Sequence, residues 1–271
     1  MTIRLLALDL DDTLLNESFH ISEQNRAAIQ RVAAAGVLVT LATGRMFHSA
    51  QPYARELEID LPLITYHGAM IRTTGGEETL FHRPVPLALA HEVVSIAKTG
   101  NFHVNAYLND ELYVAEENEN SRIYEQMARV KVNVVGDLVR FLIQAPTKIT
   151  IVNTDGRLPA LWDELKERFS DTLAITISRP HYLEITDRRA TKGQALAYLA
   201  KLHQIPREQI AAVGDSYNDL DMLEYAGMGV AVANARDEVK AVANVITETN
   251  VNHGVAAFIE KYLLAEGEQR G

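Results

Sequence analysis

Cysteine is absent from this chain of 271 residues, which excludes disulfides, thiolate metal sites and cysteine nucleophiles. The chain also has no apolar run of the roughly 20 residues that a membrane-spanning helix needs. Its first residues do not follow the basic, apolar and small-residue order of a signal peptide. We therefore expect a cytoplasmic protein, and the lack of cysteine fits a reducing compartment.

Positive charge is also scarce. Lys and Arg total 26 against 36 Asp and Glu, which gives a formal net charge of -10. The basic residues form no stripe that could neutralise nucleic-acid phosphates, so neither nucleic acids nor anionic membranes are expected partners. Hydrophobic residues make up 47% of the chain, charged residues 23%, and the mean hydropathy is -0.07. These values are typical of a soluble globular protein, and the length suggests two domains.

The most informative segment is an apolar strand near the start of the chain, residues 3–8, which runs into Asp9, Asp11 and Asp12. Because strand side chains alternate between faces, Asp9 and Asp11 project to the same side, and two like charges that close require a cation. Turn formation alone would explain Asp11 and Asp12. It does not explain Asp9, because an unpaired carboxylate inside an apolar strand costs several kcal/mol.

Apolar runs alternate with amphipathic helices in two blocks, one towards each end of the chain. In the first block, a helix over residues 23–35 precedes a strand at 37–42, a crossover of the right length for parallel pairing. The second block has apolar runs at 210–213, 229–232 and 245–247. Together the blocks predict an α/β fold with one doubly wound parallel sheet.

Between these blocks the pattern changes to an alternation with period two, as in residues 103–107 and 111–114. This alternation is typical of a half-exposed antiparallel sheet, so we expect a separate α+β module with Trp162 in its core. The expected division is a core of residues 1–83 and 188–271 with an inserted α+β module of residues 84–187.

Ligands of open parallel sheets bind outside the carboxyl ends of the strands, and here the apolar strands end in Asp9, Thr43 and Asp215. Asp219 lies four residues after Asp215, in the first turn of the next helix. These carboxylates are hard oxygen ligands suited to Mg²⁺, and no pair of histidines has the spacing of a zinc site. Helix capping is an alternative explanation for Asp219.

Lys192 has an unusual position, in the first turn of a predicted helix, where a cation opposes the helix dipole. A solvated side chain is the commoner explanation for any single lysine. Its position nevertheless suggests a second reason for its presence.

Four segments, taken in this order, closely resemble the four motifs of haloacid dehalogenase (HAD) superfamily phosphatases. They are Asp9-Leu10-Asp11-Asp12-Thr13, Thr43-Gly44-Arg45, Lys192, and Gly214-Asp215-Ser216-Tyr217-Asn218-Asp219. The resemblance covers the whole chain. The insertion, with residues 178–185 before Lys192, is similar to the Cof-type subgroup with an α+β (C2-type) cap, which implies a HAD-like core and a cap that sets substrate specificity.

This resemblance implies a phosphoric monoester hydrolase that depends on Mg²⁺. Asp9 would attack phosphorus to form an aspartyl-phosphate, and Asp11 would protonate the leaving alcohol and later activate water. Thr43 would bind the transferring phosphoryl group, and Lys192 would steady both the nucleophile and the phosphate. The implied metal ligands are Asp9, the backbone carbonyl of Asp11, Asp215 and, as a ligand or as support, Asp219.

Other positions are candidates for binding the substrate. The resemblance implies the backbone of Leu10 together with Gly44 and Asn218, and we add Arg45, His67 and Asn234 and, from the cap, Arg179, His181 and Glu184. The chain departs from the family pattern at two positions. Asp12 stands where a glycine is frequent, and His67 stands where Cof-type chains often carry asparagine. His67 either contacts the substrate or caps a strand, and we favour the cap.

The expected function is therefore Mg²⁺-dependent hydrolysis of phosphate monoesters of small metabolites, such as sugar phosphates, with the cap closing over the site. A phosphomutase that uses the same aspartyl-phosphate is one alternative. A non-catalytic sensor of phosphorylated ligands, or a receiver-like module, is another. The sequence leaves the substrate and the oligomeric state open.

Overall fold

The computed structural model describes residues 2–128 and 130–265, without the side chains of residues 126–128 and of Arg179. The chain divides into two compact units, which we call the core unit and the cap unit. The core unit comprises Met1–Arg45, Ala50–Leu80 and Thr191–Gly271, and the cap unit comprises Met46–Ser49 and Phe81–Ala190. The insertion expected at residues 84–187 falls within the second of these units.

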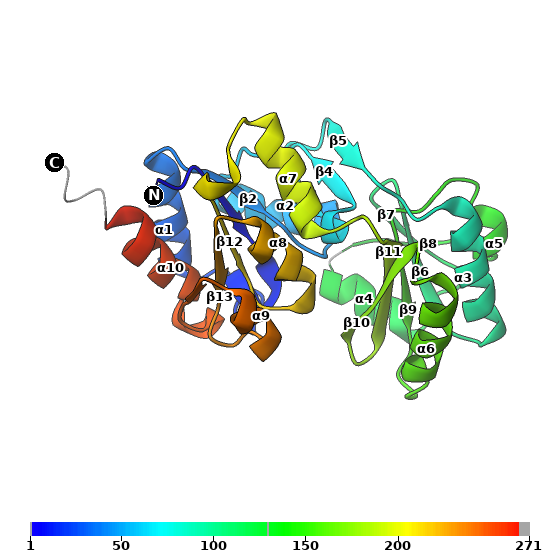
Figure 1. Cartoon of the computed structure of the whole chain (residues 1–271). Coiled ribbons are helices and arrows are strands. Elements are labelled where there is room, and N and C mark those ends of the chain that lie inside the picture. Colours follow the sequence, from blue (N-terminus) through cyan, green and yellow to red (C-terminus); the bar gives the residue numbers. More distant parts are fainter. Residues whose placement is uncertain (1, 129, 266–271) are drawn as a thin grey trace. The chain divides into compact units, whose positions relative to one another are not determined.

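A five-stranded parallel sheet forms the centre of the core unit, in the order β14-β13-β12-β1-β2 (Figure 1). Leu5 of the central strand lies opposite Leu38 on one side and Ile210 on the other. The predicted α/β fold with a doubly wound parallel sheet is confirmed. The strands are β1 (Leu5–Leu8), β2 (Leu38–Leu41), β12 (Ile210–Gly214), β13 (Met228–Ala231) and β14 (Val245–Ile246).

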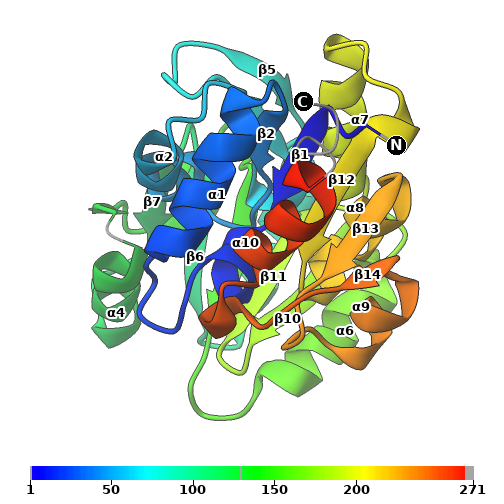
Figure 2. The same ribbon diagram turned by 90° about the vertical axis from the view of Figure 1, so that its left-hand side faces the viewer.

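Helices cover both faces of this sheet. The pair α1 and α10 packs together on one face (Figure 2), and the pair α7 and α8 packs on the other (Figure 1). The Ser22 side chain accepts a hydrogen bond from the amide of Asn25 and so caps α1, as its position predicts. The helices are α1 (Glu23–Ala34), α2 (Phe47–Glu56), α7 (Lys192–Leu202), α8 (Leu220–Tyr225), α9 (Asp237–Val242) and α10 (Gly254–Ile259).

A small sheet of β3 (Leu63–Thr65), β4 (Met70–Arg72) and β5 (Thr79–His82) continues the core unit beyond β2. Ile64 pairs with Ala42, the residue after β2, so the two sheets meet edge to edge. A short 3₁₀ segment, Tyr66–Gly68, joins β3 to β4 and carries His67. This junction places His67 beside the end of β2.

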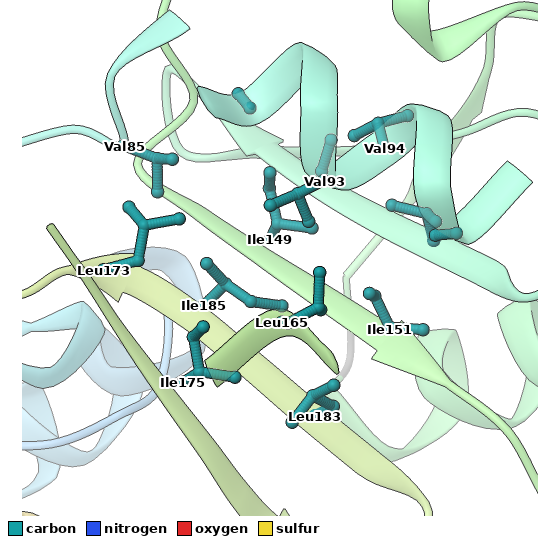
Figure 3. Close-up of a cluster of buried hydrophobic side chains, with 14 of the residues drawn as sticks. Val85, Val93, Val94, Ile149, Ile151, Leu165, Leu173, Ile175, Leu183 and Ile185 are labelled. Atoms are coloured by element: carbon teal, nitrogen blue, oxygen red, sulfur yellow. The ribbon is translucent and has the colours of Figure 1, made fainter. Parts of the chain in front are cut away.

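The cap unit contains a six-stranded sheet in the order β10-β11-β9-β6-β7-β8, with a core of its own. Apolar residues of the sheet pack against α3 and α6, for example Ile149 and Ile151 against Val93 and Leu165 (Figure 3). Trp162 packs against this cluster, as predicted. The elements are α3 (Leu87–Thr99), β6 (His103–Leu108), β7 (Glu111–Val114), α4 (Glu119–Ala128), β8 (Val132–Val134), α5 (Leu138–Phe141), β9 (Lys148–Val152), α6 (Leu158–Phe169), β10 (Leu173–Arg179) and β11 (Tyr182–Asp187).

Within the described ranges, none of the helices combines the length and the apolar character that crossing a membrane requires.

Candidate active site

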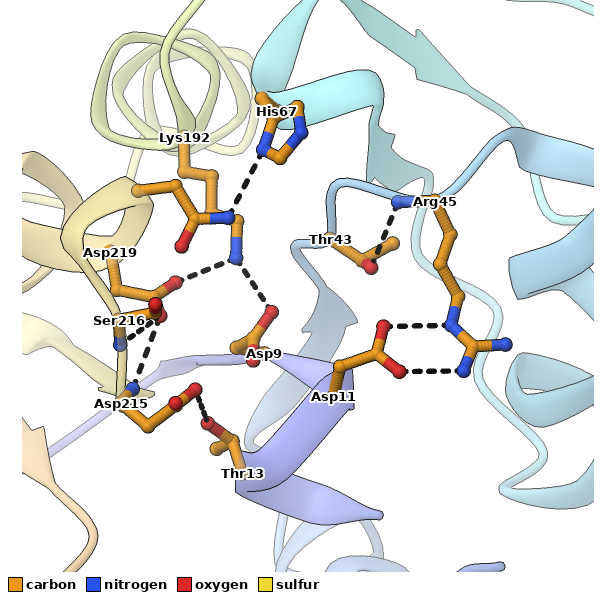
Figure 4. Close-up of polar contacts among 11 residues, drawn as sticks. Asp9, Asp11, Thr13, Thr43, Arg45, His67, Lys192, Asp215, Ser216 and Asp219 are labelled. Carbon is orange, nitrogen blue, oxygen red and sulfur yellow. Dashed lines mark hydrogen bonds and ion pairs between the residues drawn. The ribbon is translucent and has the colours of Figure 1, made fainter. Parts of the chain in front are cut away.

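Neighbouring strands of the core unit end in polar residues at one edge of the sheet. Asp9 directly follows β1, Asp215 directly follows β12, and Thr43 lies two residues after β2. The amide of Asp9 donates to the carbonyl of Val213 (3.0 Å), which extends the pairing of β1 and β12 to the edge. Figure 4 shows the side chains of Asp9, Thr43 and Asp215 gathered there. The parallel sheet thus brings together three residues that are far apart in the sequence.

Lys192 is the first residue of α7 and is fully buried. Its Nζ donates to Oδ1 of Asp9 and to Oδ1 of Asp219, both at 2.6 Å (Figure 4). Burial alone would lower the pKa of Lys192, but the carboxylates of Asp219 and Asp9 outweigh this effect and raise it. The lysine is therefore a buried cation with two negative partners, which excludes a solvated surface role.

Asp219 uses both of its carboxylate oxygens inside the protein. Oδ1 accepts from Lys192, and Oδ2 accepts from the backbone amides of Asp215 (3.1 Å) and Ser216 (3.0 Å). The residue is fully buried. Asp219 therefore orders the loop after β12 and holds Lys192, which favours the supporting role over that of a metal ligand.

Asp9, Asp215 and Asp219 each present an oxygen, and these oxygens lie within 4.8 Å of one another. Burial, with the charge of Asp219 adding to it, raises the pKa of Asp215 to about 7. Burial also raises the pKa of Asp9 well above its usual range, and the charge of Lys192 opposes this rise only in part. The cluster thus holds more negative charge than Lys192 compensates. Its hard oxygens fit Mg²⁺, with Asp9 and Asp215 as the carboxylate ligands.

The carboxylate of Asp11 pairs with a different cation, the guanidinium of Arg45. Oδ1 accepts from Nη2 of Arg45 (2.6 Å) and Oδ2 accepts from Nε (2.8 Å), so the pair is bidentate. The guanidinium lies 5.6 Å from the ring centre of Phe19 and 5.2 Å from that of Tyr53. Arg45, a candidate for binding the substrate, holds the carboxylate of Asp11.

The loop after β2 is held against the segment that follows β3. The Thr43 carbonyl accepts from the amide of His67 (3.0 Å), and the Thr43 hydroxyl accepts from the amide of Arg45 (3.2 Å). The imidazole of His67 pairs through Nδ1 with Nδ2 of Asn218 (3.0 Å). Thr43, His67 and Asn218 are thus connected, although they come from three separate loops.

Asn234 and the turn after β1 support one another. Nδ2 of Asn234 donates to the carbonyl of Asp12 (2.7 Å), and its Oδ1 accepts from the amide of Asn250 (2.9 Å). Asp12 has left-handed backbone angles (φ 59°), and the carbonyl of Leu10 accepts from the amide of Leu15 (2.9 Å). Asn234 therefore braces the backbone that carries Asp11.

Two candidates from the cap unit, Glu184 and His181, contact other residues of that unit. Glu184 accepts from Nζ of Lys148 (2.7 Å) on the neighbouring strand, and the carbonyl of His181 accepts from the amide of Asn153 (3.1 Å). The side chain of Arg179 lies outside the described part of the chain. The carboxylates, Lys192 and the Thr43 loop all belong to the core unit.

Three contributing residues were not predicted. The Thr13 hydroxyl donates to Oδ1 of Asp215 (2.9 Å), and the rings of Phe19 and Tyr53 flank Arg45. Thr13 is the last residue of the first motif. Its position there could have indicated a functional role, but none was assigned to it. The aromatic residues gave no signal, because their position beside Arg45 depends on the folded course of the loop after β1.

Comparison with known proteins supports these observations. The sequence pattern of haloacid dehalogenase-like hydrolases matches residues 6–259. The chain is 34% identical to 5-amino-6-(5-phospho-D-ribitylamino)uracil phosphatase YitU of Bacillus subtilis, over 95% of this chain and 97% of that protein. It is 31% identical to phosphatase YwpJ of the same organism, over 97% of this chain and 100% of that protein.

Solved structures give the same picture of the fold. A haloacid dehalogenase-like hydrolase from Bacteroides thetaiotaomicron has a TM-score of 0.88 and 30% identity, covering 96% of this chain and 99% of that one. The protein TM0651 from Thermotoga maritima has a TM-score of 0.86 and 33% identity, covering 96% and 97%. The likeness therefore includes the sheet that carries the site and the inserted unit.

Proposed function

Because the chain belongs to the haloacid dehalogenase-like hydrolase family and is a phosphatase, we propose that it hydrolyses phosphate monoesters of small metabolites through an aspartyl-phosphate on Asp9. The observation that carries the proposal is the buried contact of Lys192 with Asp9 and Asp219. A buried lysine with two carboxylates at a strand end is costly for stability alone, which supports a role in chemistry.

Mg²⁺, when bound, neutralises negative charge on the phosphoryl oxygens and makes attack by a carboxylate feasible. The residues that would hold it are Asp9, Asp215 and the backbone carbonyl of Asp11. Thr13 orients Asp215 through its hydroxyl, and Asp219 leaves the coordination to the other two carboxylates because Lys192 and two amides occupy its oxygens.

Asp9 and Asp11 act in both steps of the proposed reaction. In the first step, an oxygen of Asp9 forms a bond to phosphorus, the bond to the leaving oxygen breaks, and Asp11 gives that oxygen a proton. In the second step, Asp11 takes a proton from water, the water oxygen attacks phosphorus, and Asp9 is released with inorganic phosphate. Lys192 and the hydroxyl of Thr43 would stabilise the charge on the phosphoryl group in both steps.

Phosphatase relatives favour transfer to water over transfer to a second hydroxyl. Their names also indicate which esters deserve testing. YitU and two further relatives are named for 5-amino-6-(5-phospho-D-ribitylamino)uracil, and YbhA of Escherichia coli is named a pyridoxal phosphate phosphatase. We propose that the substrate is a small phosphorylated metabolite of this kind or a sugar phosphate, bound with the help of the cap unit.

The test is phosphate release from p-nitrophenyl phosphate by the wild-type protein with Mg²⁺, the same protein with EDTA, and Asp9→Asn with Mg²⁺. We expect turnover only in the first sample, and a loss of at least about a thousandfold in Asp9→Asn. Mass spectrometry of acid-quenched enzyme should find the phosphoryl adduct on the peptide that contains Asp9. Turnover that survives in Asp9→Asn would refute the assignment of the nucleophile.

The matched control is Asp60→Asn, the same change at an exposed carboxylate of the core unit, which should leave turnover unchanged. Phosphorus NMR of the products separates hydrolysis from transfer. A phosphorylated alcohol other than the substrate would indicate a mutase.

A further inference from the structure

Gly193, the second residue of α7, packs directly against the backbone of α8. A Cβ on Gly193 would lie 2.5 Å from the carbonyl oxygen of Asp221, a distance at which no side chain fits. The amide of Gly193 donates to Oδ2 of Asp221 (2.9 Å). The first amides of a helix have no partner within that helix, and Asp221 supplies one for Gly193. The starts of α7 and α8 are therefore joined by a hydrogen bond.

This contact lies beside Lys192, the first residue of α7. The Nζ of Lys192 donates to Asp9 and Asp219, both at 2.6 Å, so the far end of its side chain is held (Figure 4). Asp219 and Asp221 are two residues apart, at the start of α8. Asp219 holds the ammonium of Lys192, and Asp221 holds the amide of the residue that follows it. Lys192 is thus fixed at both ends.

An acidic residue in the first turn of a helix also stabilises that helix through the dipole, and Asp221 has this place in α8. That effect requires no contact with another element, whereas the carboxylate of Asp221 bonds to a second helix. α7 needs such a contact, because it begins with a cation, Lys192, that its own dipole disfavours. The direction of the carboxylate therefore indicates a role in α7.

We propose that Asp221 is a positioning residue, which sets the start of α7 so that Nζ of Lys192 reaches Asp9 and Asp219 together. It acts through the hydrogen bond to the amide of Gly193. The inference rests on the proposed function, since that function makes the place of Lys192 matter for chemistry. A displacement of about 1 Å in a site can lower a rate about a hundredfold, so an anchor of Lys192 has a measurable effect.

The first test observes the ammonium of Lys192 by nitrogen-15 NMR of the lysine Nζ–H groups in the metal-free protein. A buried ammonium between two carboxylates should give a slowly exchanging signal, which Lys192→Met identifies by its loss. Asp221→Ala removes the acceptor, so the signal should shift, and its exchange with water should become about tenfold faster or more. Asp221→Asn keeps a side-chain oxygen for the amide of Gly193 and should resemble the wild type.

Asp237→Ala is the matched control, because Asp237 is a fully exposed acidic residue in the first turn of α9. It should leave the Lys192 signal unchanged. Asp221→Ser, whose side chain is too short to reach the amide, replaces Asp221→Ala if that variant does not fold. An unchanged signal in Asp221→Ala or its replacement would overturn the proposal. Equal changes in Asp221→Ala and Asp221→Asn would overturn it too, because charge would then matter and the hydrogen bond would not.

The second test is the affinity for inorganic phosphate with Mg²⁺, measured by isothermal titration calorimetry. The dissociation constant should rise about three- to tenfold in Asp221→Ala and stay within about twofold in Asp221→Asn. The double variant Lys192→Met/Asp221→Ala should bind within about twofold of Lys192→Met, because Asp221 acts through Lys192. Effects that multiply would show an independent role and would overturn the proposal. Neither test depends on turnover, so failure of the proposed function appears separately, in the assay with Asp9→Asn.

Discussion

The carboxylate of Asp11 is held at both oxygens by Arg45, at 2.6 and 2.8 Å. Arg45 is itself held between the rings of Phe19 and Tyr53, and the Tyr53 hydroxyl donates to the carbonyl of Phe19 (3.2 Å). A bidentate pair fixes the direction of a carboxylate as well as its charge. Arg45 therefore sets the direction of Asp11, and it must release one carboxylate oxygen before that oxygen can carry the proton that we propose Asp11 donates.

We predict that Arg45→Met lowers kcat/KM most for substrates whose leaving group needs a proton from Asp11. An alkyl phosphate has a poor leaving group, so its kcat/KM should fall by about 30-fold or more, within the range that general acids contribute. p-Nitrophenol leaves without protonation, so kcat/KM for its phosphate should fall less than about fivefold. The parameter kcat/KM suits the comparison because it excludes the second step, in which Asp11 acts on water.

Arg31→Met is the control, because Arg31 pairs with Glu260 at the surface and both side chains are largely exposed. Arg31→Met should leave kcat/KM unchanged for both the alkyl phosphate and p-nitrophenyl phosphate. Equal losses for both substrates in Arg45→Met would contradict the prediction and would point to contact of Arg45 with the phosphoryl group itself.

Both departures from the family pattern fall at left-handed residues. Asp12 has φ 59° and His67 has φ 58°, and glycine and asparagine are the residues that adopt this conformation at least cost. The sequence raised the question of whether Asp12 alters its turn. In the structure Asp12 adopts the left-handed conformation, and Asn234 donates a hydrogen bond to its carbonyl. Backbone angles explain why these positions are special, which the residue types alone could not reveal.

At the scale of elements, the cap sheet has one apolar face and one polar face. Ile149 and Ile151 of β9 face the core of the unit, while Lys148 and Thr150 alternate with them and are also buried. Lys148 donates to Glu184 on β11 (2.7 Å), and the exposed fractions of the two side chains are 2% and 15%. This strand pair thus keeps an ion pair away from water, and the desolvation of the two charges costs free energy.

We predict that Glu184→Gln destabilises the cap unit by about 3 kcal/mol, because Lys148 would remain buried without its carboxylate. The double variant Lys148→Met/Glu184→Leu should lose less than about 1 kcal/mol, since it removes both charges. Urea unfolding followed by the fluorescence of Trp162 measures this, because the only tryptophan of the chain lies in the cap unit.

Lys98→Met serves as the control, because the pair of Lys98 with Asp137 is exposed (64% and 34%) and should contribute less than about 1 kcal/mol. If the double variant were as unstable as Glu184→Gln, packing of the two side chains would matter more than their charges. A change in kcat/KM without a change in stability would instead indicate that this face binds substrate.

The elements that could be predicted are those with a local signal. The parallel strands and the Ser22 cap follow from composition and spacing. The alternation in residues 103–107 and 111–114 also indicates strands, which are β6 and β7 in the structure. The partner of Lys148 could not be predicted, because it depends on the register between β9 and β11, which only the assembled sheet defines.

The same distinction holds for the site. Asp9, Thr43 and Asp215 could be placed together because parallel strands share one edge for their carboxyl ends. The contacts of Arg45 with Asp11 and of His67 with Asn218 join loops, whose course is not encoded by a period. Sequence therefore predicted the strand-end residues well and the loop contacts poorly.

At the scale of the whole molecule, the chain leaves the core unit after Leu80 and returns to it at Thr191. Lys192 is the next residue, so the buried lysine of the site stands directly at the return from the cap unit. The Thr191 side chain accepts from the amide of Gln194 and caps α7 there. An insertion of this length can vary without moving Lys192, because the cap of α7 and the contact with Gly68 fix its start.

Three carboxylates of the site lie close together, so the stability of the protein depends on both pH and Mg²⁺. The pKa of Asp215 rises from 3.8 to about 7 on folding, so the metal-free folded state holds an extra proton between these values. Stability is then highest below pH 4 for this group and falls until the pH passes 7. From pH 6 to pH 8 the loss should be about 1.4 kcal/mol, one pKa unit of linkage.

We predict that EDTA-treated protein shows this loss in urea unfolding followed by circular dichroism, as the difference between the wild type and Asp215→Asn, which cannot titrate at this position. Mg²⁺ binds the deprotonated carboxylates, so it should stabilise the wild type more at pH 8 than at pH 6 and remove the deficit. Asp60→Asn should follow the wild type under all conditions. If Mg²⁺ stabilised Asp215→Asn as much as the wild type at pH 8, Asp215 would not be a ligand, and the charge of the cluster would have to be balanced in another way.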